Sequence, residues 1–494
     1  MNDITAFFAF LKYCFGYKGD MSSVVAGMDW QELYSFASKQ ALLGLCFDGI
    51  ERLGKEFPEE LRLNPIGREL LMTWMGKAQQ IRRQNVKVNG VAAKLYSKFR
   101  EDGLRCCILK GQGNALMYPN PYSRTPGDID VWIDASRERI MEYAQKKFEL
   151  EDDIRLQHLE TSLDGVPVEL HFFPCSMNNP IYHARLQKWF RRNADLQCSH
   201  IVGLPDEAGD IAIPTTAFNV IYQLTHLYHH FFDEGIGMRQ IIDYFLVVND
   251  FSKNVFLNND LSNHPVNFSN HPVPLSKEGS TFSLSPSSSG SGDVTAPSRC
   301  SEPLRSKDGG ASKPSPNCAG WDRLDAIGAS KPSPNCAGWD RLDAIGASKP
   351  SPNCAGWDRL AIEEDNSASS ATAVTSSAST ALVVVQRELK YLGLWKFAGA
   401  VMYVLHKALG LSEEKMIAPM DEKRGKLLLA EILNGGNFGK HFTKYGHFTQ
   451  QGMAKKYFLK IWRNMHFVRY FPAEALCEPI FRTWHFFWRL KHRR

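Results

Sequence analysis

Long apolar runs are absent from this sequence. No segment stays apolar over the roughly 18 residues that a membrane-spanning helix requires, and the first residues, Met1-Asn2-Asp3, lack the basic start of a signal peptide. The sequence also lacks a large excess of charge of one sign, since the formal net charge is only +5 over 494 residues. That balance allows anionic partners such as nucleotides without requiring nucleic acid. We therefore expect a cytoplasmic protein with no transmembrane segment.

Paired cysteine spacings and a zinc-protease motif are missing as well. The eleven cysteines are scattered, so we expect reduced thiols rather than a disulfide framework. His226, His229 and His230 lie at helical spacing and invite a metal interpretation. No H-E-x-x-H sequence accompanies them, so metal binding by these histidines is the less favoured alternative.

Composition divides the chain into several regions. Between residues 253 and 383 Ser, Pro, Gly and Asn dominate, and the unit ASKPSPNCAGWDRLDAIG is repeated with a period of 18 residues. Because this unit has few apolar residues to stack, the region is predicted to be a disordered insertion. The predicted divisions are a helical region at 1–95, a core at 96–205, a helical region at 206–252, the insertion at 253–383 and a helical region at 384–494.

Most of the candidate functional residues lie between residues 104 and 134. Residues 106–109 are apolar and predict a buried strand. A basic, glycine-punctuated turn follows, in which backbone N–H groups could face a phosphate: Lys110, Gly111, Gln112, Gly113 and Asn114. Further on, Asp128 and Asp130 alternate with apolar residues, so both carboxylates point to one face of a second strand. Two carboxylates on one face repel each other unless a cation lies between them, and hard oxygen ligands favour Mg²⁺ or Mn²⁺.

A hairpin is predicted further along the chain. Asp164-Gly165 separates two alternating apolar runs, which is a strong hairpin signal. On the second of these strands Glu169 and His171 share the face opposite to the apolar residues. His171 is either a neighbour that orients the carboxylates or a packing residue. For Glu169 the plain alternative is a solvent-facing strand position. The patterns together predict an α+β fold with a small mixed β-sheet embedded in a largely α-helical chain.

The order of strand, glycine turn, spacer and D-x-D resembles the nucleotidyltransferases of the DNA polymerase β superfamily. Within it, LKG…YP…R…GDIDVW resembles an uncharacterised bacterial nucleotidyltransferase family, and more distantly the toxins of abortive-infection systems. The resemblance implies magnesium-dependent transfer of a nucleoside monophosphate from an NTP, with ATP the expected nucleotide. The acceptor, a small molecule, a protein or RNA, stays unidentified. Asp128, Asp130 and Glu169 would be the catalytic and metal-binding residues.

The resemblance also implies the groups that hold the nucleotide. The turn at residues 110–114 would cradle the phosphates, and Arg124 would add a cation. The usual glycine-serine pair of the superfamily is absent, with Gly111-Gln112 or Gly113-Asn114 in its place. Arg239 lies in a downstream segment that resembles the family. It either pairs with Asp243, four residues on, or reaches the triphosphate.

Two further interpretations stay open at this point. A non-catalytic nucleotide- or partner-binding protein would keep the same fold, although the presence of all three carboxylates favours an enzyme. A toxin-like nucleotidyltransferase acting on tRNA or protein would fit the helical flanks. The aromatic and basic segment at residues 481–494 predicts a core helix with a solvated end, or alternatively a weak membrane or nucleic-acid contact.

Overall fold

The computed structural model of the protein describes residues 4–150, 155–257, 371–441 and 453–492. All of them belong to one compact unit, and the second unit of the chain, residues 272–366, lies outside the described residues together with the repeats of the predicted insertion. Among the described helices, none combines the length and apolarity needed to cross a bilayer.

A four-stranded mixed sheet lies at the centre of the site-bearing region. Its order is β1-β2-β4-β3, with β2 and β4 parallel and the other pairs antiparallel. The strands are β1 (Cys106–Leu109), β2 (Ile129–Ile133), β3 (His158–Leu163) and β4 (Val166–His171). The predicted Asp164-Gly165 turn joins β3 to β4, and both of its residues have the positive φ that a tight hairpin requires. The predicted α+β fold with a small mixed sheet is confirmed.

The two faces of the sheet contact different sets of apolar residues. Alternate residues of β1, β2 and β4 pack with the C-terminal half of α6 (Arg68–Glu101) and with α8 (Arg137–Lys147). On the other face Trp132 lies beside Phe218 of α10 (Thr216–Asp233), with ring centroids 6.0 Å apart. Phe218 also stacks on Trp189 of α9 (Pro180–Ser199), at 4.6 Å. Because side chains alternate along a strand, Asp130 of β2 faces α10 together with Trp132.

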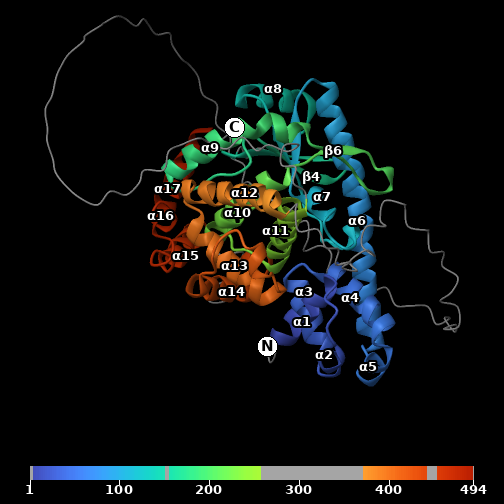
Figure 1. The fold of residues 1–494 in the computed structure, drawn as a ribbon. Helices are drawn as coiled ribbons and strands as arrows, with labels where there is room; N and C mark the ends of the chain where they lie inside the picture. The colour runs from blue at the N-terminus through green and yellow to red at the C-terminus, as the bar shows by residue number, and fades with distance from the viewer. Residues whose placement is uncertain (1–3, 151–154, 258–370, 442–452, 493–494) are drawn as a thin grey trace, which may run out of the picture. The chain divides into compact units, whose positions relative to one another are not determined.

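The helices before the sheet lie together at one end of α6, which connects them to the sheet (Figure 1). They are α1 (Ile4–Cys14), α2 (Ser22–Ala26), α3 (Trp30–Lys39), α4 (Leu43–Glu56) and α5 (Pro58–Leu63). Asp29 begins α3 as its N-cap, and its carboxylate accepts the Glu32 N–H at 2.9 Å. Arg82 of α6 pairs with Asp48 of α4 at 2.6 Å. Trp74 and Ala78 of α6 belong to the hydrophobic core that these helices share with α10, α13 and one face of the sheet.

The remaining helices surround α10, whose buried residues lie on all its sides. After the short β5 (Ile201–Gly203) and β6 (Asp210–Ala212), α10 is followed by α11 (Met238–Leu257). The chain resumes with α12 (Ala371–Tyr391), which packs against α10 and α11. The last helices are α13 (Trp395–Leu409), α14 (Glu422–Gly435), α15 (Met453–Met465), α16 (Pro472–Ala475) and α17 (Glu478–His492).

The C-terminal helices expose large apolar side chains. On α15 and α17 these residues recur at helical spacing and are between 49% and 72% exposed: Phe458, Trp462, Met465, Ile480, Trp484, Phe486 and Phe487. The predicted core role of residues 481–494 is therefore wrong for part of this helix, because one of its faces points to solvent.

Candidate active site

The parallel pairing of β2 and β4 brings two of the predicted carboxylates together. Asp130 and Glu169 are directly opposite each other in the register of these strands. His171, two residues after Glu169, lies between them, with its Nε2 3.1 Å from Asp130 Oδ1 and 3.1 Å from Glu169 Oε2. Asp130 is 5% exposed and His171 is 2% exposed, so this contact is shielded from water.

Asp128 lies at the open edge of the same site. It immediately precedes β2, and its side chain is exposed whereas that of Asp130 is buried. Desolvation by the surrounding protein, together with repulsion from Asp130 and Glu169, raises the pKa of Asp128 to about 7. A cation bound between the carboxylates would remove the part of this pKa shift that comes from their mutual repulsion.

Positive groups inside the site oppose this repulsion. Burial alone would raise the pKa of Asp130, but Lys110 and His171 hold it well below its usual range. Burial would likewise raise the pKa of Glu169, which His158 and His171 instead lower to about 2. Burial would lower the pKa of His171, and its hydrogen bonds to the two carboxylates raise it to about 9. The carboxylates are thus partly neutralised by side chains of the protein itself.

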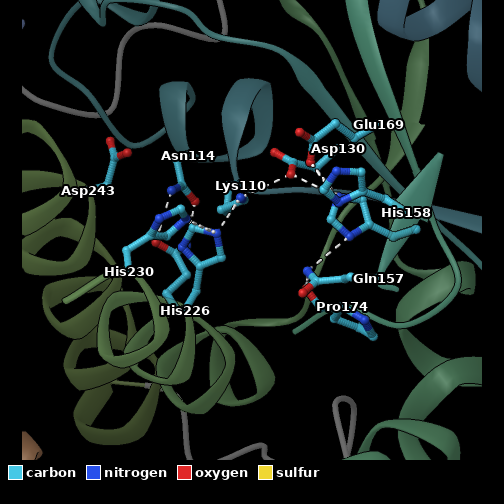
Figure 2. Close-up of polar contacts among 12 residues, drawn as sticks. Lys110, Asn114, Asp130, Gln157, His158, Glu169, Pro174, His226, His230 and Asp243 are labelled. Atoms are coloured by element: carbon cyan, nitrogen blue, oxygen red, sulfur yellow. Dashed lines mark hydrogen bonds and ion pairs between the residues drawn. The ribbon is translucent and has the colours of Figure 1, made fainter. Parts of the chain in front are cut away.

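Lys110 occupies the turn between β1 and α7 (Gly111–Ala115). Its φ of 51° lies in the left-handed region that L-residues adopt at a cost. The turn places its Nζ 3.0 Å from Asp130 Oδ1 and 2.7 Å from His226 Nε2 of α10. Lys110 therefore joins the sheet to α10 through the site, as Figure 2 shows.

The rest of the predicted phosphate-binding turn is used for packing. Gln112 is buried and its amide donates to Asn89 of α6. Asn114 exchanges two hydrogen bonds with Gln223, at 3.0 and 2.7 Å. A Cβ on Gly113 would approach Ile213 to 3.0 Å, which explains glycine there. The side chains of the turn after Lys110 are therefore engaged with α6 and α10, so they are not free to contact a phosphate.

Arg124 and Asp243 form a buried ion pair. Arg124 Nε donates to Asp243 Oδ1 at 2.9 Å and its Nη2 donates to Oδ2 at 2.8 Å, while the Tyr118 hydroxyl donates to Oδ1 at 2.8 Å. The four-residue spacing predicted that Arg239 could pair with Asp243, but the planar fork of Arg124 takes both carboxylate oxygens. Within the described residues, Asp243 therefore has Arg124 as its ion-pair partner.

Arg239 is left with a donor to spare. It is 8% exposed, and its Nη1 donates to the Thr125 carbonyl oxygen at 3.1 Å. Its Nε is buried without a hydrogen-bond partner, as is Nη1 of Arg124. Burial and repulsion from Arg124 lower the pKa of Arg239, which Asp128 and Asp243 partly offset. Two buried guanidinium groups with unused N–H donors beside Asp128 suit the binding of an anion.

The structure adds His158, which the sequence analysis missed, and brings His226, which was considered there only as a metal ligand, against Lys110. His158 of β3 pairs with His171 across the hairpin, and its Nδ1 lies 3.3 Å from Glu169 Oε2. The Asp164-Gly165 turn carried this signal, because the turn fixes which residues of the two strands are opposite. His226 and His230 are close, with 3.0 Å between their Nε2 atoms. Burial and neighbouring cations lower the pKa of His226, so it stays neutral and accepts a hydrogen bond from Lys110.

Comparison with known proteins agrees with this geometry. Residues 26–262 match the family described as "Uncharacterised nucleotidyltransferase". The matched segment contains the four-stranded sheet and all the predicted site residues, from Lys110 to Arg239. No curated protein and no solved structure matches the chain. Residues 26–262, which carry a mixed sheet with Asp130 opposite Glu169, are thus similar to this uncharacterised nucleotidyltransferase family, as the sequence pattern predicted.

Proposed function

We propose that the protein transfers a nucleoside monophosphate from an NTP to an acceptor, with release of pyrophosphate, in a reaction that depends on a divalent metal ion. The observation that supports this most directly is the pairing of Asp130 with Glu169 on parallel strands, with Asp128 close enough to both for their charges to raise its pKa. The family match supports nucleotidyl transfer in general. The nucleotide, the acceptor and the metal are part of the proposal, and ATP is the first nucleotide to test.

The donor set fits Mg²⁺ or Mn²⁺. Asp128, Asp130 and Glu169 offer carboxylate oxygens, the ligands that these ions prefer. Burial and repulsion from Asp130 and Glu169 together raise the pKa of Asp128, and a bound cation would relieve the repulsive part. When bound, such ions would supply positive charge for the phosphates of the NTP and for the attacking oxygen of the acceptor.

The protein's own residues divide the remaining work. Lys110 and Arg239 are placed to bind phosphate oxygens, Lys110 as a point charge and Arg239 through its unused N–H. Glu169 has a pKa of about 2, which makes it a weak base, so its role is to hold charge rather than to take the acceptor proton. His171 donates to both carboxylates and fixes their orientation.

A non-catalytic nucleotide-binding protein is the second candidate. The observation in its favour is that Lys110 and His171 already neutralise part of the carboxylate charge. In that case the protein would bind NTP without consuming it. The toxin-like activity on tRNA or protein is one form of the first proposal, distinguished by the acceptor.

Labelled nucleotides separate these candidates. Purified protein would be incubated with α-³²P-labelled NTPs, Mg²⁺ or Mn²⁺ and cell extract, and the labelled product would be identified. Asp130→Asn should abolish labelling, while Asp164→Asn at the exposed hairpin tip serves as the matched control. Label from the γ-position should appear in pyrophosphate only. NTP binding without any α-label transfer would support the non-catalytic candidate.

A further inference from the structure

A second group of potential metal ligands lies on the β3–β4 hairpin beside the carboxylates of the site. One ligand atom from each of His158, Glu169 and His171 lies within 4.8 Å of the other two. No other three His, Cys, Asp or Glu side chains of the described residues meet this condition. His158 and His171 are paired in the hairpin register, so the sheet itself holds the two imidazoles together.

His158 makes no hydrogen bond although it is buried. Its side chain is 8% exposed and both ring nitrogens lack a hydrogen-bond partner. Leaving such atoms without partners is unfavourable. Its Nδ1 is nevertheless 3.3 Å from Glu169 Oε2, while its Nε2 is 3.6 Å from Glu160 Oε1. Two ligand atoms that point at a shared ion do not point at each other, which accounts for a short separation without a hydrogen bond.

The separations fit ligands of a single ion. Ligand atoms at about 2.0–2.2 Å from one ion are about 3.0–3.5 Å apart at the edges of its coordination shell. The edge from His158 Nδ1 to Glu169 Oε2 is 3.3 Å, and the edge from His171 Nε2 to the same oxygen is 3.1 Å. A further edge of 3.1 Å joins His171 Nε2 to Asp130 Oδ1.

We propose that His158 Nδ1, His171 Nε2 and Glu169 Oε2 bind a first-row transition-metal ion, with Asp130 Oδ1 as the fourth ligand. This inference rests on the proposed nucleotidyl transfer and specifies the metal that serves it. Imidazole nitrogens favour Mn²⁺, Co²⁺ and Zn²⁺ over Mg²⁺, which prefers oxygen ligands and keeps its water. The position beside Glu169 therefore selects a transition-metal ion, whereas Asp128 belongs to the oxygen-rich side.

Binding requires one rearrangement outside the ligands. His171 can offer Nε2 to an ion only after the proton that Nε2 donates to Asp130 and Glu169 has left, as the tautomer that carries its proton on Nδ1. Nδ1 lies 3.3 Å from the Gln157 amide nitrogen, which also donates to the Pro174 carbonyl at 3.1 Å. A half-turn of the Gln157 amide places its oxygen against Nδ1–H, the outer contact that metal-bound histidines commonly make.

The first test needs no variant. The untagged full-length protein would be freed of metal with a chelator and titrated with Co²⁺, Mn²⁺ and Mg²⁺ separately, without nucleotide. We expect one equivalent of Co²⁺ to give the intense visible absorption of a four- or five-coordinate ion. Calorimetry should give affinities in the order Co²⁺ above Mn²⁺ above Mg²⁺. A weak six-coordinate spectrum, or Mg²⁺ binding as tightly as Co²⁺, would overturn the proposal.

A variant identifies the ligand. His158→Leu fills the same space and removes no hydrogen bond, so the fold should be retained. Loss of an outer-shell partner costs about 10- to 100-fold in metal affinity, and loss of a ligand should cost at least as much for Co²⁺. Mg²⁺ affinity should stay unchanged. His466→Leu removes an exposed histidine between α15 and α16 and controls for adventitious metal binding. It should leave the affinities for Co²⁺ and Mg²⁺ unchanged.

The outcomes separate this inference from the proposed function. A Co²⁺ spectrum that His158→Leu abolishes, in a protein that transfers no nucleotide with any metal, supports the site and removes the function. Nucleotidyl transfer supported equally by Mg²⁺ and Mn²⁺, and unaffected by His158→Leu, supports the function and overturns the site.

Discussion

Replacing Asp128 with Asn tests the charge repulsion in the metal-free site. Asn keeps the shape of the side chain and removes its charge. The pKa of Asp128 is raised from an ordinary value of 3.8 to about 7, first by desolvation and then by repulsion from Asp130 and Glu169. The folded protein therefore keeps a proton that the unfolded chain has released. The contribution of Asp128 to the free energy of unfolding is complete below about pH 3.8, and it is lost as the pH rises through about 7.

The size of the effect follows from the exposure of the side chain. A shift of this size corresponds to about 4 kcal/mol if it is fully expressed in the free energy of unfolding. Asp128 is exposed, so solvent screens much of the repulsion, and we expect about 1 kcal/mol. In chelator, Asp128→Asn should be more stable than the wild type by this amount at pH 8. The difference should shrink as the pH is lowered to 5.

Urea denaturation at pH 5, 6.5 and 8 measures this difference. Asp164→Asn, whose parent carboxylate pairs with Lys94 at the hairpin tip, should not reproduce it. Added Mn²⁺ should stabilise the wild type more than Asp128→Asn, and nucleotidyl transfer by the variant should fall by several orders of magnitude. A variant that is less stable than the wild type in chelator at pH 8 would refute the repulsion on which the metal assignment depends.

Two further predictions concern phosphate binding, and two more concern stability elsewhere. Lys110→Met should raise the KM for NTP more than it lowers kcat, because the ammonium meets the phosphates in both ground and transition states; unchanged nucleotide affinity would contradict this. Arg239→Gln should weaken the binding of the nucleoside triphosphate more than that of the monophosphate, as calorimetry with both ligands would show. Replacing residues 258–370 with a short Gly/Ser bridge should leave Tm nearly unchanged, since α11 and α12 already pack together. Burial raises the pKa of Glu474 to about 7, so its contribution to stability is complete below about 4.5 and is lost as the pH rises through 7. Glu474→Gln should therefore flatten the fall in unfolding free energy between pH 5 and 8, measured with urea.

Local patterns were sufficient to predict the sheet and the face that carries the carboxylates. The apolar run at Cys106–Leu109 forms β1, and the Asp164-Gly165 turn forms the predicted hairpin. Strand alternation predicted that Asp130 would lie on the opposite face from Ile129 and Val131, and the two cores confirm this. These features depend on neighbours in the sequence, which is why they could be predicted.

Contacts between distant segments could not be predicted in the same way. Lys110 meets His226 only because α10 docks on the sheet, 116 residues further along the chain. Helical spacing makes Arg239 a possible partner of Asp243, but Asp243 pairs with Arg124, which is 119 residues away. A bidentate bond from a distant guanidinium outweighs a single contact along one helix. No local pattern in the sequence indicates which of the two will form.

The long helix α6 has a consequence for how the molecule unfolds. Its 34 residues extend over about 50 Å. Its first half contributes Trp74 to one hydrophobic core, and its second half contributes Leu95 and Phe99 to the other. Melting either core would fray a helix that the other core needs, so the two should lose structure in a single cooperative transition rather than in sequence. Calorimetry should then give one heat-absorption peak, and Gly replacements at the middle of α6 should split it into two.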